Sequence, residues 1–592
     1  PVQLFWWRNW DVRLVLLRWR MWSKNFAPNL IQVSQKNKLY LKKIKINNMR
    51  NRKFNTLRAA SVLVPAMALY NGCAENKSNL LADPVKNKDG KYNIIFLTTD
   101  QENYMRTYPQ GSNYQAREML RKIGTSFEKH YACSNVSTSS RSVIYTGRHV
   151  TETLMLDNTN ITCQPNMSKD LKTVGDMMRE AGYYTAYKGK WHISEGDTSL
   201  EEYGFADWTE GDMYGAPLEG FNHDATIAEN SIKWMEEKGK NLNKEGKSFF
   251  LAINFINPHD IMYFNESGGG AFGQATAAPD VPVYKTSYQT PVSPTWNEPL
   301  DKEGRPSSHR EYTLQWEIAT GKNPSSETGW KTFQDYYFNC IQDCDNYMLE
   351  VLDYLKENDL LKNTIIVYTS DHGEMLGSHG MKGKNGNIYE NNIHVPLVIY
   401  HPEYPGGRSC NHVTSHLDLA PTFVDMGTET STEETEITDG IKGCSLMPAV
   451  NNPATDVRNG SGALFVYDMI SMMDKDAIVI PVSQDKVSIK VDLSKKGYLR
   501  GIITEDYKFA RYFSPLNFNT PTNIESLYSQ NEVELYKTDT DETENLAWPK
   551  GNNKELVESY NSKLNALIEK EIGTDDGRET DNFIGGLKSY AK

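Results

Sequence analysis

Four short apolar stretches stand out in the pattern of hydrophobic and polar positions along the chain. Each is rich in β-branched or aromatic residues and has the length of one strand. Strands buried on both faces of a parallel sheet are continuously apolar, because helices cover both sides of such a sheet. The pattern therefore predicts an α/β fold. The stretches are 93–99 (NIIFLTT), 183–187 (YYTAY), 249–255 (FFLAINF) and 364–370 (TIIVYTS).

Polar residues follow each of these stretches. The carboxyl ends of parallel strands lie at one edge of a sheet, and ligands of open α/β sheets bind beyond that edge. We therefore expect four separate segments to converge on one crevice. These segments are Asp100-Gln101, Lys190-Trp191-His192, Pro258-His259 and Asp371-His372.

Two of the four segments have the chemistry of a metal site. Asp100 and Asp371 are carboxylates, and Gln101 and His372 are their neutral neighbours. A set that is rich in oxygen ligands suits a hard divalent cation, Ca²⁺ or Mg²⁺. An imidazole is a less usual ligand for such an ion, so the presence of a metal is better supported than its identity.

Fixed positive charge and proton carriers surround the expected metal site. Lys190, Arg141 and Lys384 supply the positive charge, and His192 and His259 have side chains that titrate near neutral pH. An ester of a strong oxyacid needs its negative charge held in the ground state and spread further in the transition state. The combination favours hydrolysis of such an ester.

A run of small residues supplies the candidate nucleophile. The run Ser137-Thr138-Ser139-Ser140-Arg141 precedes Thr146-Gly147-Arg148 by a short interval. A serine near a fixed guanidinium is suited to attack an anionic ester. The same spacing by itself is also typical of a serine that caps a helix.

This run resembles the signature of the sulfatase family in its serine-type form. The family pattern is Cys or Ser, any residue, Pro, a small residue and Arg, then Thr-Gly-Arg or Thr-Gly-Lys. Ser139 stands where the family usually has Pro. The loop after His372 matches the family pattern less well, so Lys382 is an alternative to Lys384 as the lysine of the site. Further matching motifs are Gly189-Lys190-Trp191-His192, Asn257-Pro258-His259 and Ser370-Asp371-His372-Gly373-Glu374.

The resemblance implies both a fold and a metal-dependent chemistry. The fold is the sandwich of the alkaline phosphatase superfamily, with a large mixed sheet flanked by helices and a smaller C-terminal α+β subdomain. Ser137 would be oxidised to formylglycine by a serine-type maturation enzyme. The implied metal ligands are Asp100, Gln101, Ser137, Asp371 and His372, with Ca²⁺ or Mg²⁺ as the ion.

The resemblance also implies roles for the remaining site residues. Arg141, Lys190 and Lys384 would hold the charge of the sulfate. His259 would protonate the departing alcohol, and His192 would assist the loss of the second proton, which expels sulfate. The implied substrate is a sulfated carbohydrate or an aryl sulfate.

Two other functions stay open. Phosphonate monoester and phosphodiester hydrolases share the nucleophile and metal of this scaffold. A lipid-anchored glycan-binding protein without turnover is the second alternative, favoured if Ser139 blocks maturation. The net charge of −12 argues against a general nucleic-acid binder.

The amino-terminal part differs in composition from the rest of the 592 residues. Met49 resembles a start site, followed by a positive segment, a short apolar segment and a loose lipobox that ends at Cys73. We expect an exported protein of a Gram-negative bacterium, periplasmic or attached to the outer membrane through lipid at Cys73. The expected divisions are an upstream extension 1–48, a signal peptide 49–73, a linker 74–92, a catalytic domain 93–445 and a C-terminal subdomain 446–592.

Within the catalytic domain, three loops carry further expectations. The segments 211–222 and 268–305 are expected to shape the part of the pocket that takes the alcohol half of the substrate. The acidic, Thr-rich segment 428–438 is expected to be a surface loop.

Overall fold

The computed structural model describes residues 83–592 apart from 214 and 482–486. The expected upstream extension, the signal peptide with Cys73 and part of the linker lie outside these residues. Among the described residues, no helix combines the length and apolar character needed to cross a membrane.

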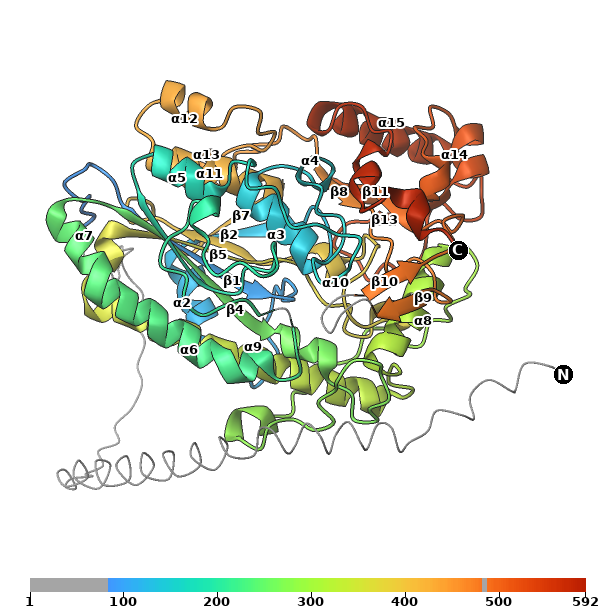
Figure 1. The fold of residues 1–592 in the computed structure, drawn as a ribbon, viewed down its shortest axis with the longest axis horizontal. Helices are drawn as coiled ribbons and strands as arrows, with labels where there is room; N and C mark the ends of the chain where they lie inside the picture. Colours follow the sequence, from blue (N-terminus) through green and yellow to red (C-terminus); the bar gives the residue numbers. More distant parts are fainter. Residues whose placement is uncertain (1–82, 214, 482–486) are drawn as a thin grey trace, which may run out of the picture. The chain divides into compact units, whose positions relative to one another are not determined.

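A seven-stranded sheet forms the centre of the described region (Figure 1). Its strand order is β3-β4-β1-β5-β6-β2-β7, and only β6 runs antiparallel to its neighbours. All four predicted strands occur, as β1, β3, β4 and β5. The strands are β1 Asn93–Asp100, β2 Thr125–Tyr131, β3 Tyr184–Gly189, β4 Phe249–Pro258, β5 Thr364–Ser370, β6 Leu397–Tyr400 and β7 Arg408–Ser415.

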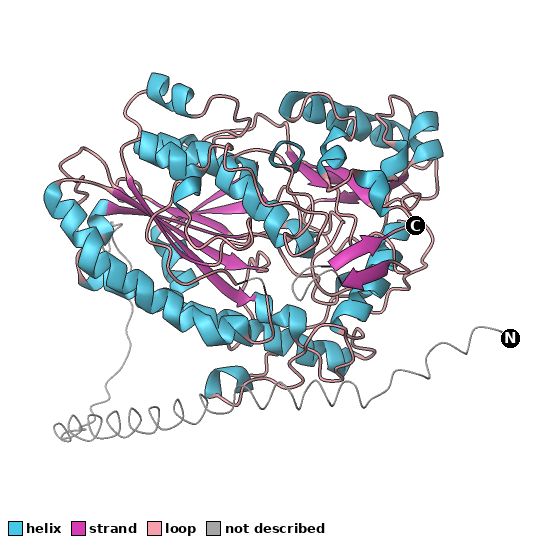
Figure 2. Ribbon diagram, in the orientation of Figure 1, coloured by secondary structure: helices cyan, strands magenta, loops and turns pink. Residues whose placement is uncertain are grey.

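Helices cover both faces of this sheet (Figure 2). Ile94 and Phe96 of β1 pack on the side of α3, α5 and α11, whereas Ile95 and Leu97 pack on the side of α2, α6 and α9. Successive residues of one strand thus enter opposite cores, which explains the continuous apolar run. The helices are α2 Gln115–Ile123, α3 Ser137–Thr146, α5 Val174–Glu180, α6 Glu219–Trp234, α9 Glu327–Glu357 and α11 Leu419–Gly427.

A second, antiparallel sheet follows later in the chain in the order β13-β12-β11-β8. Helix α15 (Lys554–Glu571) packs its apolar residues on one face of it. The large mixed sheet with flanking helices and this smaller sheet confirm the predicted fold class. The strands are β8 Ala463–Tyr467, β11 Tyr498–Ile503, β12 Tyr507–Phe513 and β13 Glu532–Lys537, with a separate pair β9 Ile478–Pro481 and β10 Val487–Lys490.

Further α-helices lie between these elements. One of them corrects an expectation, because the segment 428–438 is not a simple loop. It contains helix α12, in which the Thr430 side chain accepts a hydrogen bond from the Glu433 backbone N–H at 3.2 Å. These helices are α4 Val150–Thr153, α7 Lys240–Glu245, α8 Ser307–Thr320, α10 Glu390–Ile393, α12 Ser431–Ile437, α13 Met447–Asn451 and α14 Ile524–Gln530.

Candidate active site

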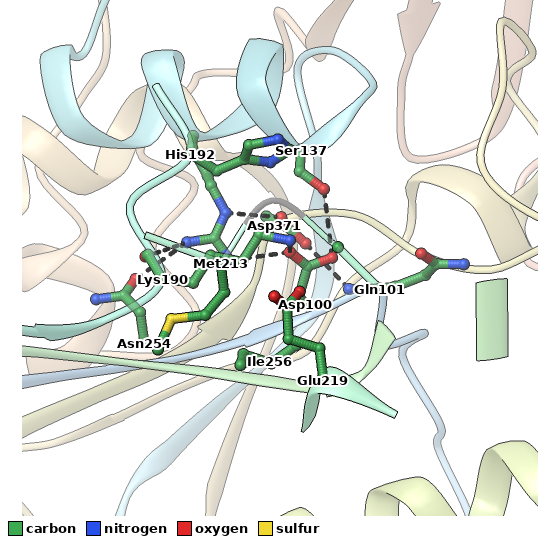
Figure 3. Close-up of polar contacts among 12 residues, drawn as sticks. Asp100, Gln101, Ser137, Lys190, His192, Met213, Glu219, Asn254, Ile256 and Asp371 are labelled. Atoms are coloured by element: carbon green, nitrogen blue, oxygen red, sulfur yellow. Dashed lines mark hydrogen bonds and ion pairs between the residues drawn. The ribbon is translucent and has the colours of Figure 1, made fainter. Parts of the chain in front are cut away.

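The predicted site residues come from six segments of the chain. Asp100, His259 and Asp371 stand at or directly after the carboxyl ends of β1, β4 and β5. Ser137 begins helix α3, and Arg141 lies one turn further along it. Figure 3 shows side chains of these segments gathered around the Asp100 and Asp371 carboxylates.

In each of the carboxylates of Asp100 and Asp371, Oδ2 faces a cation. The Oδ1 atoms face one shared point beside His372 Nε2, which we call the common centre. Asp100 Oδ2 lies 2.8 Å from Lys190 Nζ and 3.2 Å from Arg141 Nη2, and Asp371 Oδ2 lies 3.0 Å from Arg141 Nε. The Oδ1 atoms face His372 Nε2, at 3.7 Å from Asp100 and 3.6 Å from Asp371. The Oδ2 atoms are thus paired with cations, and the Oδ1 atoms are directed toward one point near His372 Nε2.

This centre fits a divalent cation. The donor atoms of Asp100, Asp371 and His372 all lie within 4.8 Å of one another, and all three residues are buried. Two ligands at right angles, each 2.3–2.6 Å from a shared Ca²⁺, are about 3.4 Å apart. The separations between these Oδ1 atoms and the imidazole nitrogen are close to that value, so the donor set and its spacing suit the predicted ion.

Gln101 takes a different position from the one its predicted role requires. Its side-chain Nε2 donates to Glu374 at 2.5 Å, and in Figure 3 the amide extends away from the two carboxylates. Its backbone N–H instead donates to Asp371 Oδ1 at 3.0 Å. In this conformation the backbone of Gln101 orients the Asp371 carboxylate, and the Gln101 side chain is directed away from the common centre.

The structure separates the two candidate lysines. Lys384 Nζ donates to Ser137 Oγ at 3.0 Å. Lys382 Nζ donates to the carbonyl oxygens of Thr320 and Gly321, at 3.2 Å and 2.8 Å. Lys384 therefore reaches the site, and Lys382 stabilises a helix end.

Ser137 is at the meeting point of these groups. Its Oγ lies 2.9 Å from His372 Nε2 and 3.3 Å from Asp100 Oδ1, besides the contact with Lys384. Ser137 is fully buried and is the first residue of α3, where the free N–H groups and the helix dipole favour negative charge. An oxyanion near Ser137 would be stabilised by the helix and by Lys384.

The surroundings set the charge state of the ionisable groups. Burial raises the pKa of the Asp100 carboxyl, but Lys190 and the other positive groups outweigh burial and hold that pKa well below its usual range. Burial, and next Lys190, lower the pKa values of His192 and His259 well below 6.5. Burial also lowers the pKa of Lys384 to about 8. Both imidazoles are therefore neutral at pH 7 in the free site, and a bound anion acts in the opposite direction on their pKa values.

One site residue, Asn254, was missed by the sequence reasoning. Its Oδ1 accepts from Tyr145 OH at 2.8 Å and from Arg141 Nη1 at 3.3 Å, so it fixes the guanidinium. Beside it, Gly189 has φ +83°, and a Cβ there would lie 2.0 Å from the Asn254 carbonyl oxygen. A polar residue inside the otherwise apolar run 249–255 was the signal that could have identified Asn254.

Comparison with known proteins finds similarity to sulfatases. The sulfatase family model matches residues 92–428. The N-acetylglucosamine-6-O-sulfatase of Bacteroides thetaiotaomicron is 26% identical over 432 residues, which cover 63% of this chain and 73% of that protein. The arylsulfatase K of Canis lupus familiaris is 26% identical over 61% of this chain and 66% of its own length.

A solved structure supports the fold. The structure of BT4656 in complex with its substrate D-glucosamine-2-N,6-O-disulfate has a TM-score of 0.58 and 20% identity, covering 82% of this chain and 99% of that one.

Proposed function

Because the chain belongs to the sulfatase family, we propose that it hydrolyses sulfate monoesters with a nucleophile derived from Ser137. The observation that carries the proposal is the position of one hydroxyl. Ser137 Oγ lies within 3.3 Å of Lys384, His372 and Asp100, at the amino end of a helix. An oxyacid ester bound there meets a nucleophile, positive charge and a metal site at one point.

Three cations would hold the sulfate group. Arg141 and Lys190 are fixed by Asp100 and Asp371, and Lys384 contacts the nucleophile. Because these charges are fixed before the substrate arrives, little reorganisation is needed when negative charge spreads over the sulfate oxygens. Arg141 is further fixed by Asn254 and by the Lys190 carbonyl oxygen, at 3.0 Å.

A divalent metal ion and the oxidation of Ser137 to formylglycine would complete the site. Asp100, Asp371 and His372 would hold Ca²⁺ or Mg²⁺, which supplies charge stabilisation when it is bound. Formylglycine at position 137 supplies two hydroxyls after hydration, so that one attacks sulfur and the other allows sulfate to leave. An unmodified serine would need water to open a sulfated serine.

His259, Asp371 and His192 would each carry out one proton transfer. His259 would donate a proton to the departing alcohol oxygen, once the negative charge of a bound sulfate has raised its pKa. Asp371 would help to remove the proton of the attacking hydroxyl. His192 is neutral in the free site and would accept the second proton, which accompanies release of sulfate.

A sulfated glycan is the substrate class that we favour. A relative with 26% identity is named an N-acetylglucosamine-6-O-sulfatase, and a structural neighbour binds a disulfated glucosamine. An exported protein would meet such glycans outside the cytoplasm. Export and lipid attachment at Cys73 stay predictions, since those residues lie outside the described part of the chain.

Substrate assays test the activity. Purified, metal-loaded protein is incubated with sulfated glucosamines, an aryl sulfate, an aryl phosphodiester and an aryl phosphonate, and the release of sulfate or alcohol is measured. We expect sulfate release, fastest from a sulfated sugar. Faster turnover of the phosphodiester or phosphonate would favour the hydrolase alternative, and sugar binding without any release would favour the binding protein.

Mass spectrometry tests the nucleophile. The protein is expressed with a serine-type maturation enzyme, and the peptide that contains residue 137 is measured. We expect a species lighter by two hydrogens, in partial yield because Ser139 replaces the usual proline. Complete absence of that species in a competent host would exclude formylglycine chemistry for this chain.

A further inference from the structure

The backbone of residues 190–192 is held by hydrogen bonds on several sides. Lys190 N–H donates to the Asn254 carbonyl oxygen at 3.1 Å. Its carbonyl oxygen accepts from Arg141 and, at 2.7 Å, from Tyr187 OH. The His192 carbonyl oxygen accepts from Thr138 Oγ1 at 2.8 Å. The Asn254 backbone and the side chains of Arg141, Tyr187 and Thr138 thus hold the segment 190–192 in place.

The two remaining N–H groups of the segment meet a single carboxylate, that of Asp212. Trp191 N–H donates to Asp212 Oδ1 at 2.9 Å, and His192 N–H donates to Asp212 Oδ2 at 2.7 Å. Met213 N–H also donates to Oδ1, at 2.9 Å. A charged acceptor makes stronger hydrogen bonds than a neutral one, so Asp212 is a strong restraint on these peptide groups.

His192 needs such a restraint. Its φ is +58°, in the left-handed region that residues other than glycine rarely adopt. A strained backbone persists only where its surroundings over-determine it. Direct bonding of its N–H to Asp212 and of its carbonyl oxygen to Thr138 fixes both sides of the residue, and therefore the direction in which the imidazole leaves the backbone.

The segment of Asp212 also reaches the second histidine. The Gly215 carbonyl oxygen accepts from Tyr263 OH at 2.9 Å, and a Cβ on Gly215 would lie 2.8 Å from His259 Cε1. The segment after β3 therefore contacts the backbone of one proton carrier and the ring of the other.

We propose that Asp212 is a positioning residue, which holds the His192 imidazole where it accepts the second proton of the reaction. The inference rests on the proposed function. In that step a proton passes from the remaining hydroxyl of the nucleophile to an imidazole nitrogen. A carbonyl forms on the nucleophile carbon, its C–O bond to the sulfate breaks, and the electron pair of that bond leaves with sulfate. The Asp212 carboxylate accepts from the backbone N–H groups of Trp191, His192 and Met213, so in this proposal it acts on the reaction through His192.

Pre-steady-state kinetics test the proposal. Matured, metal-loaded protein is mixed with an aryl sulfate, and the aryl alcohol is followed from the first turnover. We expect Asp212→Asn to release about one alcohol per matured site at the wild-type rate, and then to turn over ~10- to 100-fold more slowly than wild type, because a small displacement of a catalytic group has effects of that size. His192→Ala should show the same fast first turnover.

Two further variants separate positioning from a general structural effect. The double variant Asp212→Asn/His192→Ala should be no slower than His192→Ala alone, because Asp212 acts through His192. Asp89→Asn is the matched control, since the Asp89 carboxylate also accepts from backbone N–H groups, those of Lys91 at 3.2 Å and Ser248 at 2.6 Å, at the opposite end of the sheet. It should keep wild-type kinetics.

Three results would overturn the inference: wild-type steady-state turnover in Asp212→Asn, an equal slowing of the first and later turnovers, or additive effects in the double variant. If Asp212→Asn fails to fold, Asp212→Glu, which keeps the charge and displaces the carboxylate, is measured with the same expectations. Wild-type protein that releases no sulfate from any substrate would instead reject the proposed function.

Discussion

Two of the clusters of buried charge in the described part of the protein are balanced differently. Behind the second sheet, Arg500 is fully buried and pairs with three carboxylates, of Asp468 at 2.6 Å, Asp575 at 2.9 Å and Glu579 at 3.1 Å. Burial, and next the Asp468 carboxylate, raise the pKa of Glu579 to about 8, so that Glu579 keeps its proton at neutral pH. This cluster limits its own charge.

In the active site, cations outnumber carboxylates, whereas carboxyl groups outnumber cations around Arg500. Three cations, Arg141, Lys190 and Lys384, are grouped around the two carboxylates of Asp100 and Asp371. A divalent ion at the same place would add further positive charge. Since uncompensated buried charge is costly, a bound anion stabilises this site, whereas the Arg500 cluster gains nothing from one. We therefore expect the Arg500 cluster to support the fold and the active-site cluster to support binding and turnover.

The largest expected effect comes from changing the balance of the active site. Asp371→Asn removes a proposed metal ligand and the partner of Arg141 Nε, so we expect turnover to fall by ~1000-fold or more. The apolar residues of β5 are unchanged, so the protein should still fold. Turnover, metal content and near-UV circular dichroism are measured on the same sample. Near-normal turnover with full metal content would contradict the assignment.

The reverse outcome is expected at Arg500. Arg500→Leu leaves buried carboxylates without their cation, which should lower the free energy of unfolding by about 3–5 kcal/mol. The substitution should leave turnover per folded molecule unchanged, because Arg500 belongs to the second sheet. Urea unfolding and active-site-normalised kinetics are compared with wild type. A loss of turnover without loss of stability would show that the two clusters are coupled.

The sequence predicted the active site far better than the Arg500 cluster. Strand-end residues such as Asp100 and Asp371 are predictable because the apolar pattern locates each strand and the topology brings the ends together. The Arg500 cluster draws on residues from 468 to 579 that no local pattern connects.

Side-chain direction was the main limit within the site itself. The sequence reasoning assigned Gln101 to the metal site, but its amide turns to Glu374, a residue 273 positions further along the chain. Asn254 was overlooked because its partner Arg141 lies 113 positions away. Such orientations depend on tertiary contacts, which strand and helix patterns do not encode.

A pair of neighbouring lysines sharpens the comparison on a smaller scale. Burial lowers the pKa of both Lys384 and Lys382 to about 8, but only Lys384 contacts Ser137. Lys384→Met should lower kcat ~100- to 1000-fold, the usual cost of losing one group that stabilises the transition-state charge. Lys382→Met is the matched control and should keep kcat while its stability falls. Equal losses of kcat in the two variants would remove Lys384 from the sulfate site.

The smallest effect concerns a buried carboxylate that has no cation as a hydrogen-bonding partner. Asp157 is fully buried and accepts from the Asn158 backbone N–H at 2.8 Å and from the Ser471 hydroxyl and backbone N–H at 3.0 Å and 3.1 Å. Burial raises its pKa from 3.8 to about 6. The folded state therefore binds this proton more tightly than the unfolded state does, so that stability is lost as the pH rises from about 4 to about 6 and is constant above that range.

Asp157→Asn removes this titration and isolates its contribution. Wild type should lose about 2 kcal/mol of unfolding free energy relative to the variant between pH 4 and pH 7, because one pKa unit corresponds to about 1.4 kcal/mol. Urea unfolding at pH 4, 5, 6 and 7 gives the difference, and the variant cancels the contributions of all other groups. A difference that is constant with pH, or one that grows in favour of wild type as the pH rises, would show that hydrogen bonds outweigh burial at Asp157. A buried carboxylate would then be balanced without a cation in this protein, and the contrast drawn between these two charged clusters would lose its generality.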